Sequence, residues 1–179
     1  MDKLTQIAYL LVNFAFSIYI LLVVLRFLLQ TVRADFYNPL SQFIVKATNP
    51  LLMPLRKVIP GLMGIDFSSI VLAFGLQVVA IQLLGMIDSH STGLVSNLLF
   101  ESLKALVFLV LNIYFFSLLI MVVVSWVAPH SMNPAISIIH SITEPLLRPI
   151  RRVLPAMGGL DFSVMVAILG IQIVKIILT

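Results

Sequence analysis

A passage that occurs twice constrains this chain more than any other feature of its sequence. Residues 48–68 read TNPLLMPLRKVIPGLMGIDFS, and residues 143–163 read TEPLLRPIRRVLPAMGGLDFS. The two passages align without a gap at a constant shift of 95 residues. Such an internal match indicates a duplicated structural unit. We therefore expect two copies of one unit, a first repeat at residues 1–87 and a second at residues 88–179.

The composition places the chain in a membrane. Hydrophobic residues make up 61% of its 179 residues and charged residues only 10%, whereas soluble domains have about 25% charged residues. There are too few polar side chains to cover a water-exposed surface, so we expect an integral membrane protein. The sequence has no cysteine, which excludes disulfides, thiolate metal sites and cysteine-based catalysis.

Four apolar stretches predict membrane-spanning helices, because about 20 apolar residues cross a bilayer as a helix. They are approximately Leu4–Leu29, Phe67–Ile87, Leu103–Val127 and Phe162–Thr179. Two spans per repeat bring both repeats in and out on the same side. The predicted fold is therefore an all-α membrane protein with four transmembrane helices in two parallel helix-loop-helix repeats, related by a pseudo-two-fold axis along the membrane normal.

The distribution of lysine and arginine predicts the orientation. Eight of these eleven residues lie in the two repeat loops and the adjoining end of the first span: Arg26, Arg33, Lys46, Arg56, Lys57, Arg148, Arg151 and Arg152. Lys3, Lys104 and Lys175 lie on the opposite side. Because basic loops stay in the cytoplasm, the repeat loops should be cytoplasmic and both termini outside. The net charge of +4 then reflects cytoplasmic loops that face anionic lipid, so no nucleic-acid partner is expected.

Each repeat loop predicts an amphipathic helix in the plane of the membrane interface. Asn38-Pro39 and Asn133-Pro134 indicate a turn or a helix start. Further along, the pattern Thr-x-Pro at 48–50 and 143–145 indicates the start of the amphipathic helix, with proline at its first position. An apolar stripe at helical spacing follows, with the basic residues off it. The stripe consists of Leu51, Leu52, Leu55, Val58 and Ile59, and in the second copy of Leu146, Leu147, Ile150, Val153 and Leu154. Such a helix places its apolar face in lipid and its basic face against headgroups.

Arg56 with Asp66, repeated as Arg151 with Asp161, is the strongest candidate site. In one interpretation each pair is a salt bridge or helix cap that holds the loop helix against the next span. In the other, both copies form a site for a lipid headgroup, an ion or a partner. The candidate residues are Arg56, Lys57, Asp66, Ser68, Arg151, Arg152, Asp161 and Ser163.

Polar residues within the spans are few. Gln77 and Gln172 occupy equivalent positions near mid-membrane. We expect their amides to approach across the pseudo-axis as an interhelical hydrogen bond, in preference to lining a polar path. Arg26 should extend toward the membrane surface or pair with an acidic residue on the cytoplasmic side.

No pattern of catalytic residues is present. There is no nucleophile motif, no phosphate-binding glycine loop and no pair of acids in an enzyme-like context, and the histidines lack metal-ligand spacing. We expect neither an enzyme nor a bound cofactor or metal.

The duplicated motif resembles that of the YggT family of small bacterial membrane proteins, also called YlmG. The motif is N-P, then T-x-P-x-x-x-P-x-R-[RK]-x-x-P, then G-[IL]-D-F-S, and it occurs at 38–68 and 133–163. The second copy departs from the first at Glu144 for Asn49 and at Arg148 for Met53. The resemblance implies a protein of the bacterial inner membrane.

The resemblance implies no defined activity. Members of the family are linked to osmotic-stress tolerance and ion homeostasis, to cell division or to plastid nucleoid distribution, and one plastid branch helps attach a haem. No histidine lies in the duplicated passage, so no haem role is expected here.

Two hypotheses from different classes follow. The first is a non-enzymatic scaffold, or an assembly or envelope-maintenance factor, that acts through the basic loops. Its partners would be anionic lipid headgroups and either another membrane protein or further copies of the chain. The alternative is a component of osmotic-stress tolerance or of potassium homeostasis and transport, which should place converging polar groups at mid-membrane.

Overall fold

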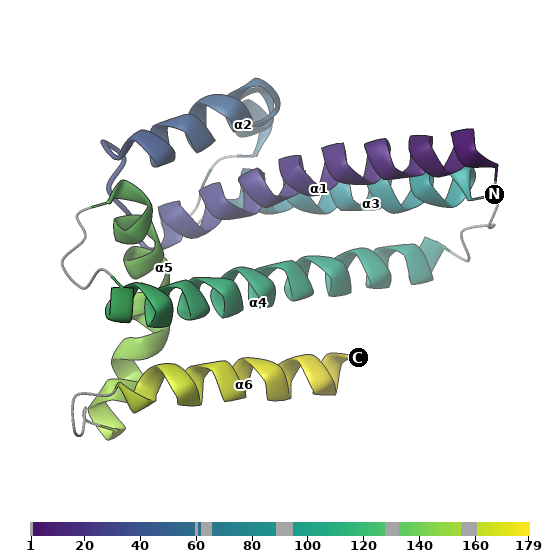
Figure 1. Ribbon diagram of the computed structural model, residues 1–179. Coiled ribbons are helices and arrows are strands. Elements are labelled where there is room, and N and C mark those ends of the chain that lie inside the picture. The colour runs from purple at the N-terminus through teal and green to yellow at the C-terminus, as the bar shows by residue number, and fades with distance from the viewer. Residues whose placement is uncertain (1, 60, 62–65, 89–94, 128–132, 155–160) are drawn as a thin grey trace.

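The chain is helical throughout the residues that the computed structural model describes, which are all except 1, 60, 62–65, 89–94, 128–132 and 155–160 (Figure 1). The helices are α1 (Lys3–Thr31), α2 (Pro39–Val58), α3 (Phe67–Ile87), α4 (Val95–Val127), α5 (Pro134–Val153) and α6 (Phe162–Leu178). No strand occurs among these residues. The all-α class expected from the sequence is therefore confirmed.

Three helices, α1, α3 and α4, are long and apolar enough to cross a membrane, judged by length and composition. α6 is apolar but has 17 residues, which at 1.5 Å per residue is about 26 Å. The predicted third span began at Leu103, whereas α4 begins at Val95. Hydropathy marked only its apolar part, because the helix continues through polar residues such as Ser102, whose hydroxyl donates to the Leu98 carbonyl at 2.7 Å.

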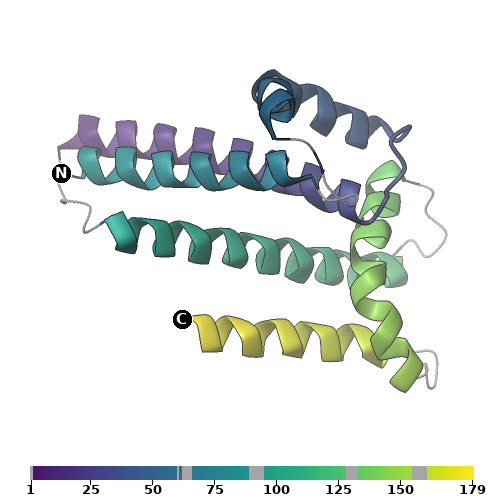
Figure 2. The same ribbon diagram turned by 180° about the vertical axis from the view of Figure 1, so that it is seen from behind.

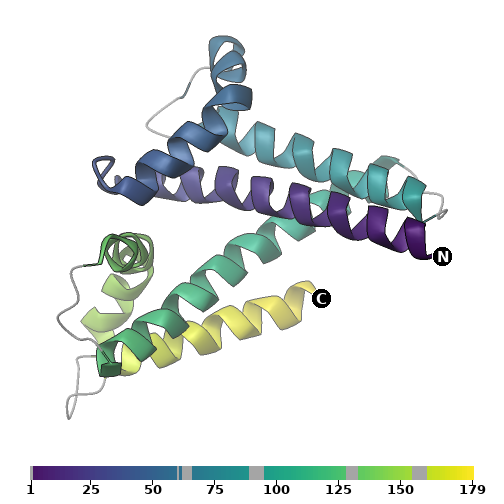
Figure 3. The same ribbon diagram turned by 45° about the horizontal axis from the view of Figure 1, so that its top comes forward.

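The two repeats run in the same direction. α1 packs against α3, and α4 packs against α6. α2 and α5 lie at one end of the spans, and both chain termini lie at the other end (Figures 1 and 3). α5 crosses the ends of α4 and α6 (Figure 2). This arrangement agrees with the parallel repeats expected from two long helices per unit.

The loop helices begin at the two Asn-Pro pairs, which the sequence marked as a turn or a helix start, and they run on through Thr-x-Pro without a break. α2 starts after Asn38, whose side-chain oxygen accepts from the Leu40 amide at 2.9 Å, with Pro39 in the first turn. Asn133 caps α5 in the same way by accepting from the Ala135 amide. The predicted start at Thr48 was wrong, because Asn-Pro already supplies a cap and a first-turn proline.

The longer helix also changes which residues are buried. Ser41, Ile44, Thr48 and Leu52 form the buried face of α2, while Leu51 and Val58 are exposed. The predicted apolar stripe was therefore only partly right. It was drawn over two turns, and the helix buries one side over its whole length of 20 residues.

A tight turn joins α1 to α2. The Ala34 amide donates to the Leu29 carbonyl at 2.9 Å, and the Arg33 amide donates to the Gln30 carbonyl at 3.1 Å. Arg33 has φ 52°, a left-handed conformation that usually selects glycine at this point of a helix end. Ala34 is buried beside Leu29, and this apolar contact accompanies the turn.

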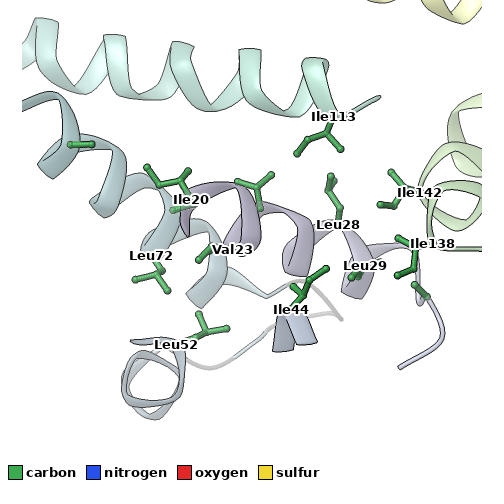
Figure 4. Packing of buried hydrophobic residues seen from close by; sticks show 14 residues of the cluster. Ile20, Val23, Leu28, Leu29, Ile44, Leu52, Leu72, Ile113, Ile138 and Ile142 are labelled. Carbon is green, nitrogen blue, oxygen red and sulfur yellow. The ribbon is translucent and has the colours of Figure 1, made fainter. Parts of the chain in front are cut away.

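Two apolar clusters hold the helices together. The larger one joins α1, α2 and α3 to Ile113 of α4 and to Ile138 and Ile142 of α5 (Figure 4). The smaller one is formed by α4, α5 and α6 around Leu118, Leu147 and Ile171. α5 therefore contributes to both clusters, and it links the second repeat to the first.

Candidate functional site at the ends of the loop helices

Arg56 and Asp66 join the end of α2 to the start of α3. The Arg56 guanidinium forms an ion pair with the Asp66 carboxylate, and the same Nη2 donates to Oε1 of Gln30 on α1 at 2.9 Å. The Ser69 hydroxyl donates to the same carboxylate oxygen, Asp66 Oδ2, at 2.6 Å. The Arg56–Asp66 pair thus connects three helices, and Asp66, as the N-cap of α3, also meets the positive end of that helix.

Arg151 and Asp161 form the corresponding site in the second repeat. Nε and Nη2 of Arg151 donate to Asp161 Oδ2 at 3.0 and 2.8 Å. Nη1 of Arg151 donates to Glu144 Oε2 at 2.9 Å. This arginine is therefore shared between two carboxylates. The Asp161 side chain is 35% exposed and that of Asp66 only 2%, so the two pairs lie in different environments.

The serines of the two motifs have different partners. The Ser68 hydroxyl donates to the Ile59 carbonyl at 2.6 Å, at the end of α2. The Ser163 hydroxyl donates to the Asp161 carboxylate, and its amide donates to Asp161 Oδ1 at 3.0 Å. Ser69, which bonds Asp66, corresponds to Val164 in the second repeat. Asp66 is thus bound by Ser69, three residues after it, whereas Asp161 is bound by Ser163, two residues after it.

Hydrogen bonds keep both aspartates ionised. Burial by itself would raise the pKa of Asp66, but hydrogen bonds from Arg56 and Ser69 and the charge of Arg56 outweigh it and hold the pKa below its usual range. For Asp161 the same opposition of burial by Ser163 and Arg151 also lowers the pKa. Among the described residues, Arg56 therefore pairs with Asp66 alone, and Arg151 pairs with both Asp161 and Glu144. Both arrangements match the interpretation of the motif as a salt bridge.

Sequence reasoning missed the role of Arg26. This residue is buried in α1, and its Nη1 donates to Thr48 Oγ1 at 2.7 Å, to Asn49 Oδ1 at 2.8 Å and to the Val45 carbonyl at 3.0 Å. The expected extension to the surface or pairing with an acid was wrong. The guanidinium binds polar groups of α2 at the turn that precedes Pro50, where the helix has one amide fewer to donate.

In the second repeat the loop helix α5 contacts the long helix α4 without an arginine at this position. Met121 stands at the position equivalent to Arg26 and accepts from the Thr143 hydroxyl at 2.8 Å. Conversely, Met53 of the first repeat corresponds to Arg148 of the second, which lies 3.7 Å from Glu144. Arginine and methionine have therefore exchanged places between the repeats. The exchange is visible in the sequence once positions 95 residues apart are compared over the spans as well as the motif.

The remaining predicted residues are placed as follows. Lys57 and Arg152, at equivalent positions, are exposed and have no partner within the described part of the chain. Gln77 lies on α3 and Gln172 on α6, with α4 between these helices (Figures 1 and 3). The structure does not bring the two amides together. α3 packs on α1 and α4, whereas α6 packs on α4 and α5, so α3 and α6 lie on different sides of α4.

Comparison with known proteins now adds to this geometry. The CCB3/YggT family model matches residues 5–87 and again residues 100–179. The chain belongs to the CCB3/YggT family. The two matched segments correspond to the two repeats. No solved structure matches the chain.

The similar curated proteins of the CCB3/YggT group have no described activity. An uncharacterized protein of Pseudomonas aeruginosa is 48% identical over 90% of this chain and 82% of its own length. An uncharacterized protein of Vibrio alginolyticus is 43% identical over 90% of this chain and 88% of its own length. Escherichia coli YggT, also uncharacterized, is 38% identical over 92% and 85%.

We predict that the two aspartates contribute unequally to stability. Asp66→Asn leaves the buried Ser69 hydroxyl and the Arg56 guanidinium without a charged acceptor, so it should lower the free energy of unfolding by about 1–3 kcal/mol. Asp161→Asn, at a more exposed pair, should cost about 0–1 kcal/mol. Unfolding in mixed micelles, followed by circular dichroism, measures both. Equal losses would contradict the difference in environment.

The loss of stability in Asp66→Asn should depend on pH. Because the pKa of Asp66 is lower in the folded than in the unfolded protein, its stabilising effect is complete above the unfolded pKa of about 3.9. The effect is lost as the pH falls through the lower, folded pKa. The difference in stability between the wild type and Asp66→Asn should therefore be largest at pH 7 and should shrink below about pH 4.

The arginine–methionine exchange predicts a rescue. Arg26→Met removes the donor to Thr48 and Asn49 and should lower the free energy of unfolding by about 1–3 kcal/mol. Adding Asn49→Glu and Met53→Arg reproduces the side chains of the second repeat and should restore most of the loss. Melting of the single and triple variants in detergent compares them. A triple variant no more stable than Arg26→Met would show that the exchange is not a compensated unit.

Proposed function

We propose that this chain is a non-enzymatic scaffold of the bacterial inner membrane, with its two loop helices at the cytoplasmic face. One observation carries the proposal. In each repeat one arginine is paired with an aspartate, and the next basic residue, Lys57 or Arg152, is exposed. The paired arginine fixes the helix, so that the neighbouring charge is presented at a defined place to an anionic headgroup or an acidic partner.

In this proposal α6 is the fourth span. Its 17 residues are at the lower limit of length for crossing a bilayer. α2 and α5 would then lie along the interface, where amphipathic helices with basic faces bind. The excess of lysine and arginine at this end of the molecule supports a cytoplasmic position.

Contacts within the spans also favour a scaffold. Charged groups in the long helices are used to join helices: Arg26 binds α2, and Lys175 donates to Asn112 Oδ1 at 2.6 Å and lies over the Phe115 ring at 4.7 Å. These groups stabilise the packing of neighbouring helices. A protein built in this way resembles a fixed frame that presents its loop helices.

Binding of anionic lipid tests the proposal. Lys57→Gln with Arg152→Gln should weaken stabilisation of the purified protein by phosphatidylglycerol, because each basic residue at an anionic surface contributes about 1 kcal/mol. The melting temperature would be measured with mixed micelles that contain either phosphatidylglycerol or phosphatidylcholine. Only the phosphatidylglycerol-dependent increase should fall.

The matched control is Lys3→Gln with Lys104→Gln, which removes the same charge from the opposite end of the molecule. This variant should retain the phosphatidylglycerol-dependent increase. If both double variants lose it equally, the charge acts without regard to place, and the loop helices have no special role in lipid binding.

The alternative function is a component of potassium homeostasis or osmotic-stress tolerance. The charged and amide groups of Lys175 and Asn112, which face each other between α4 and α6, are the observation that favours it, since ionisable groups within spans often mark ion pathways. Potassium flux into liposomes that contain the purified protein would distinguish the two functions. Robust flux that Lys175→Met abolishes would reverse the order.

A further inference from the structure

The two repeats contact each other through two different surfaces. α5 of the second repeat packs on α1 and α2 of the first, and α4 packs on α3. A closed two-fold axis would also pair α2 with α4 and α1 with α6. Among the described residues neither of these pairs forms a comparable contact. The predicted pseudo-two-fold axis is therefore not closed by contacts within the chain, and each repeat is left with one half of the interface unused.

Equivalent residues show the unused halves directly. Leu28 at the end of α1 and Ile138 on α5 lie in one cluster where the repeats meet, and they are 5% and 8% exposed (Figure 4). Their equivalents 95 residues away are Val123 on α4 and Phe43 on α2. These two side chains are 57% and 60% exposed. Both positions remain large and apolar, although nothing in the described part of the chain covers them.

A polar contact repeats the pattern. The side-chain amide of Asn38, which caps α2, donates to the carbonyl of Pro134 at the start of α5 at 2.8 Å. The equivalent donor is the amide of Asn133, and the equivalent acceptor is the carbonyl of Pro39. Both of these residues are exposed, and the Asn133 amide has no acceptor among the described residues. The apolar part and the polar part of the interface thus each occur twice in the chain. One copy is in contact within the chain, and the other copy is exposed.

From this we infer that a second copy of the chain covers these surfaces. Phe43 of one copy would pack against Val123 at the end of α4 of the next copy, as Ile138 packs against the end of α1 within the chain. Asn133 would donate to the partner copy's first loop helix, as Asn38 donates to Pro134. The contact is heterologous, because it joins two different surfaces, and such contacts generate rings when the rotation closes.

A second copy fits these surfaces for a specific reason. The chain already contains a working example of the contact, with apolar side chains and one hydrogen bond in matching register. Lipid could cover Phe43 and Val123, but it offers no reason for the exposed side-chain amide of Asn133 to be matched with an exposed carbonyl at Pro39. The proposal does not depend on the scaffold function, since any activity of the protein could be carried out by such an assembly.

Disulfide cross-linking tests the contact, and the absence of native cysteine makes the experiment clean. Phe43→Cys and Val123→Cys chains with different tags would be co-expressed and oxidised in native membranes. We expect a mixed product that carries both tags, and little product from either variant alone. The double variant Leu28→Cys with Ile138→Cys is the positive control, since its disulfide should close within one chain.

The matched negative control is Ser125→Cys, which lies at nearly the same depth as Val123 on the opposite side of α4. It should give no mixed product with Phe43→Cys. The proposal is wrong if Phe43→Cys links only to itself, which indicates a face-to-face contact. It is also wrong if no product forms while the positive control closes, which indicates a surface covered by lipid.

A measurement without cysteine keeps the inference open to refutation if a cysteine variant does not fold. The wild-type protein in mild detergent should have the mass of an oligomer by light scattering. Phe43→Arg should reduce it to a monomer, whereas Met53→Arg, which places on α2 the residue that α5 has naturally, should not. A monomeric wild-type protein would overturn the proposal.

Discussion

The ion pair between the end of each loop helix and the residue that caps the following helix is the contact on which the rest of the structure depends. α2 and α5 lie across the ends of long apolar helices, and apolar packing alone would allow them to slide or rotate. Arg56 and Asp66, and Arg151 and Asp161, fix one end of each loop helix to a defined residue. The aspartate also caps the next helix. A single carboxylate therefore sets both where one helix ends and where another begins.

The middle of each loop helix is fixed in a way that differs between the repeats. In the first, Arg26 binds Thr48 and Asn49 from within α1. In the second, Met121 occupies that position, and the charge has moved to Glu144 and Arg148 on the outer side of α5. The buried arginine makes the first repeat a polar joint, and the second repeat has an apolar joint with a charged surface. The two repeats thus keep the same arrangement of helices, but they differ in where their charged side chains lie.

The sequence predicted the apolar helices and the two repeats, because hydropathy and a 95-residue shift report directly on both. Three of the four predicted spans, α1, α3 and α4, are long and apolar enough to cross a membrane. The start of α3 and the pairing of Arg56 with Asp66 could be predicted, because Asp66 directly precedes an apolar run and Arg56 lies in the last turn of the helix before it. The start of α2 was misplaced because Thr48-x-Pro50 imitates a helix start, whereas Asn38 and Pro39 supply the actual one. The role of Arg26 was missed since its acceptors lie about twenty residues away, on another helix. The separation of Gln77 from Gln172 depends on which helices pack together, and residue spacing does not record that.

The central claim is that both loop helices lie on the cytoplasmic side, with α6 returning the chain to the outside. Alkaline phosphatase, which is active only outside the cytoplasm, reports this directly when it is fused to one chain at two positions. The account predicts high activity for a fusion after Thr179 and none for a fusion after Met53 of α2. High activity at Met53, or its absence at Thr179, would contradict the four-span topology and with it the cytoplasmic place of the paired sites.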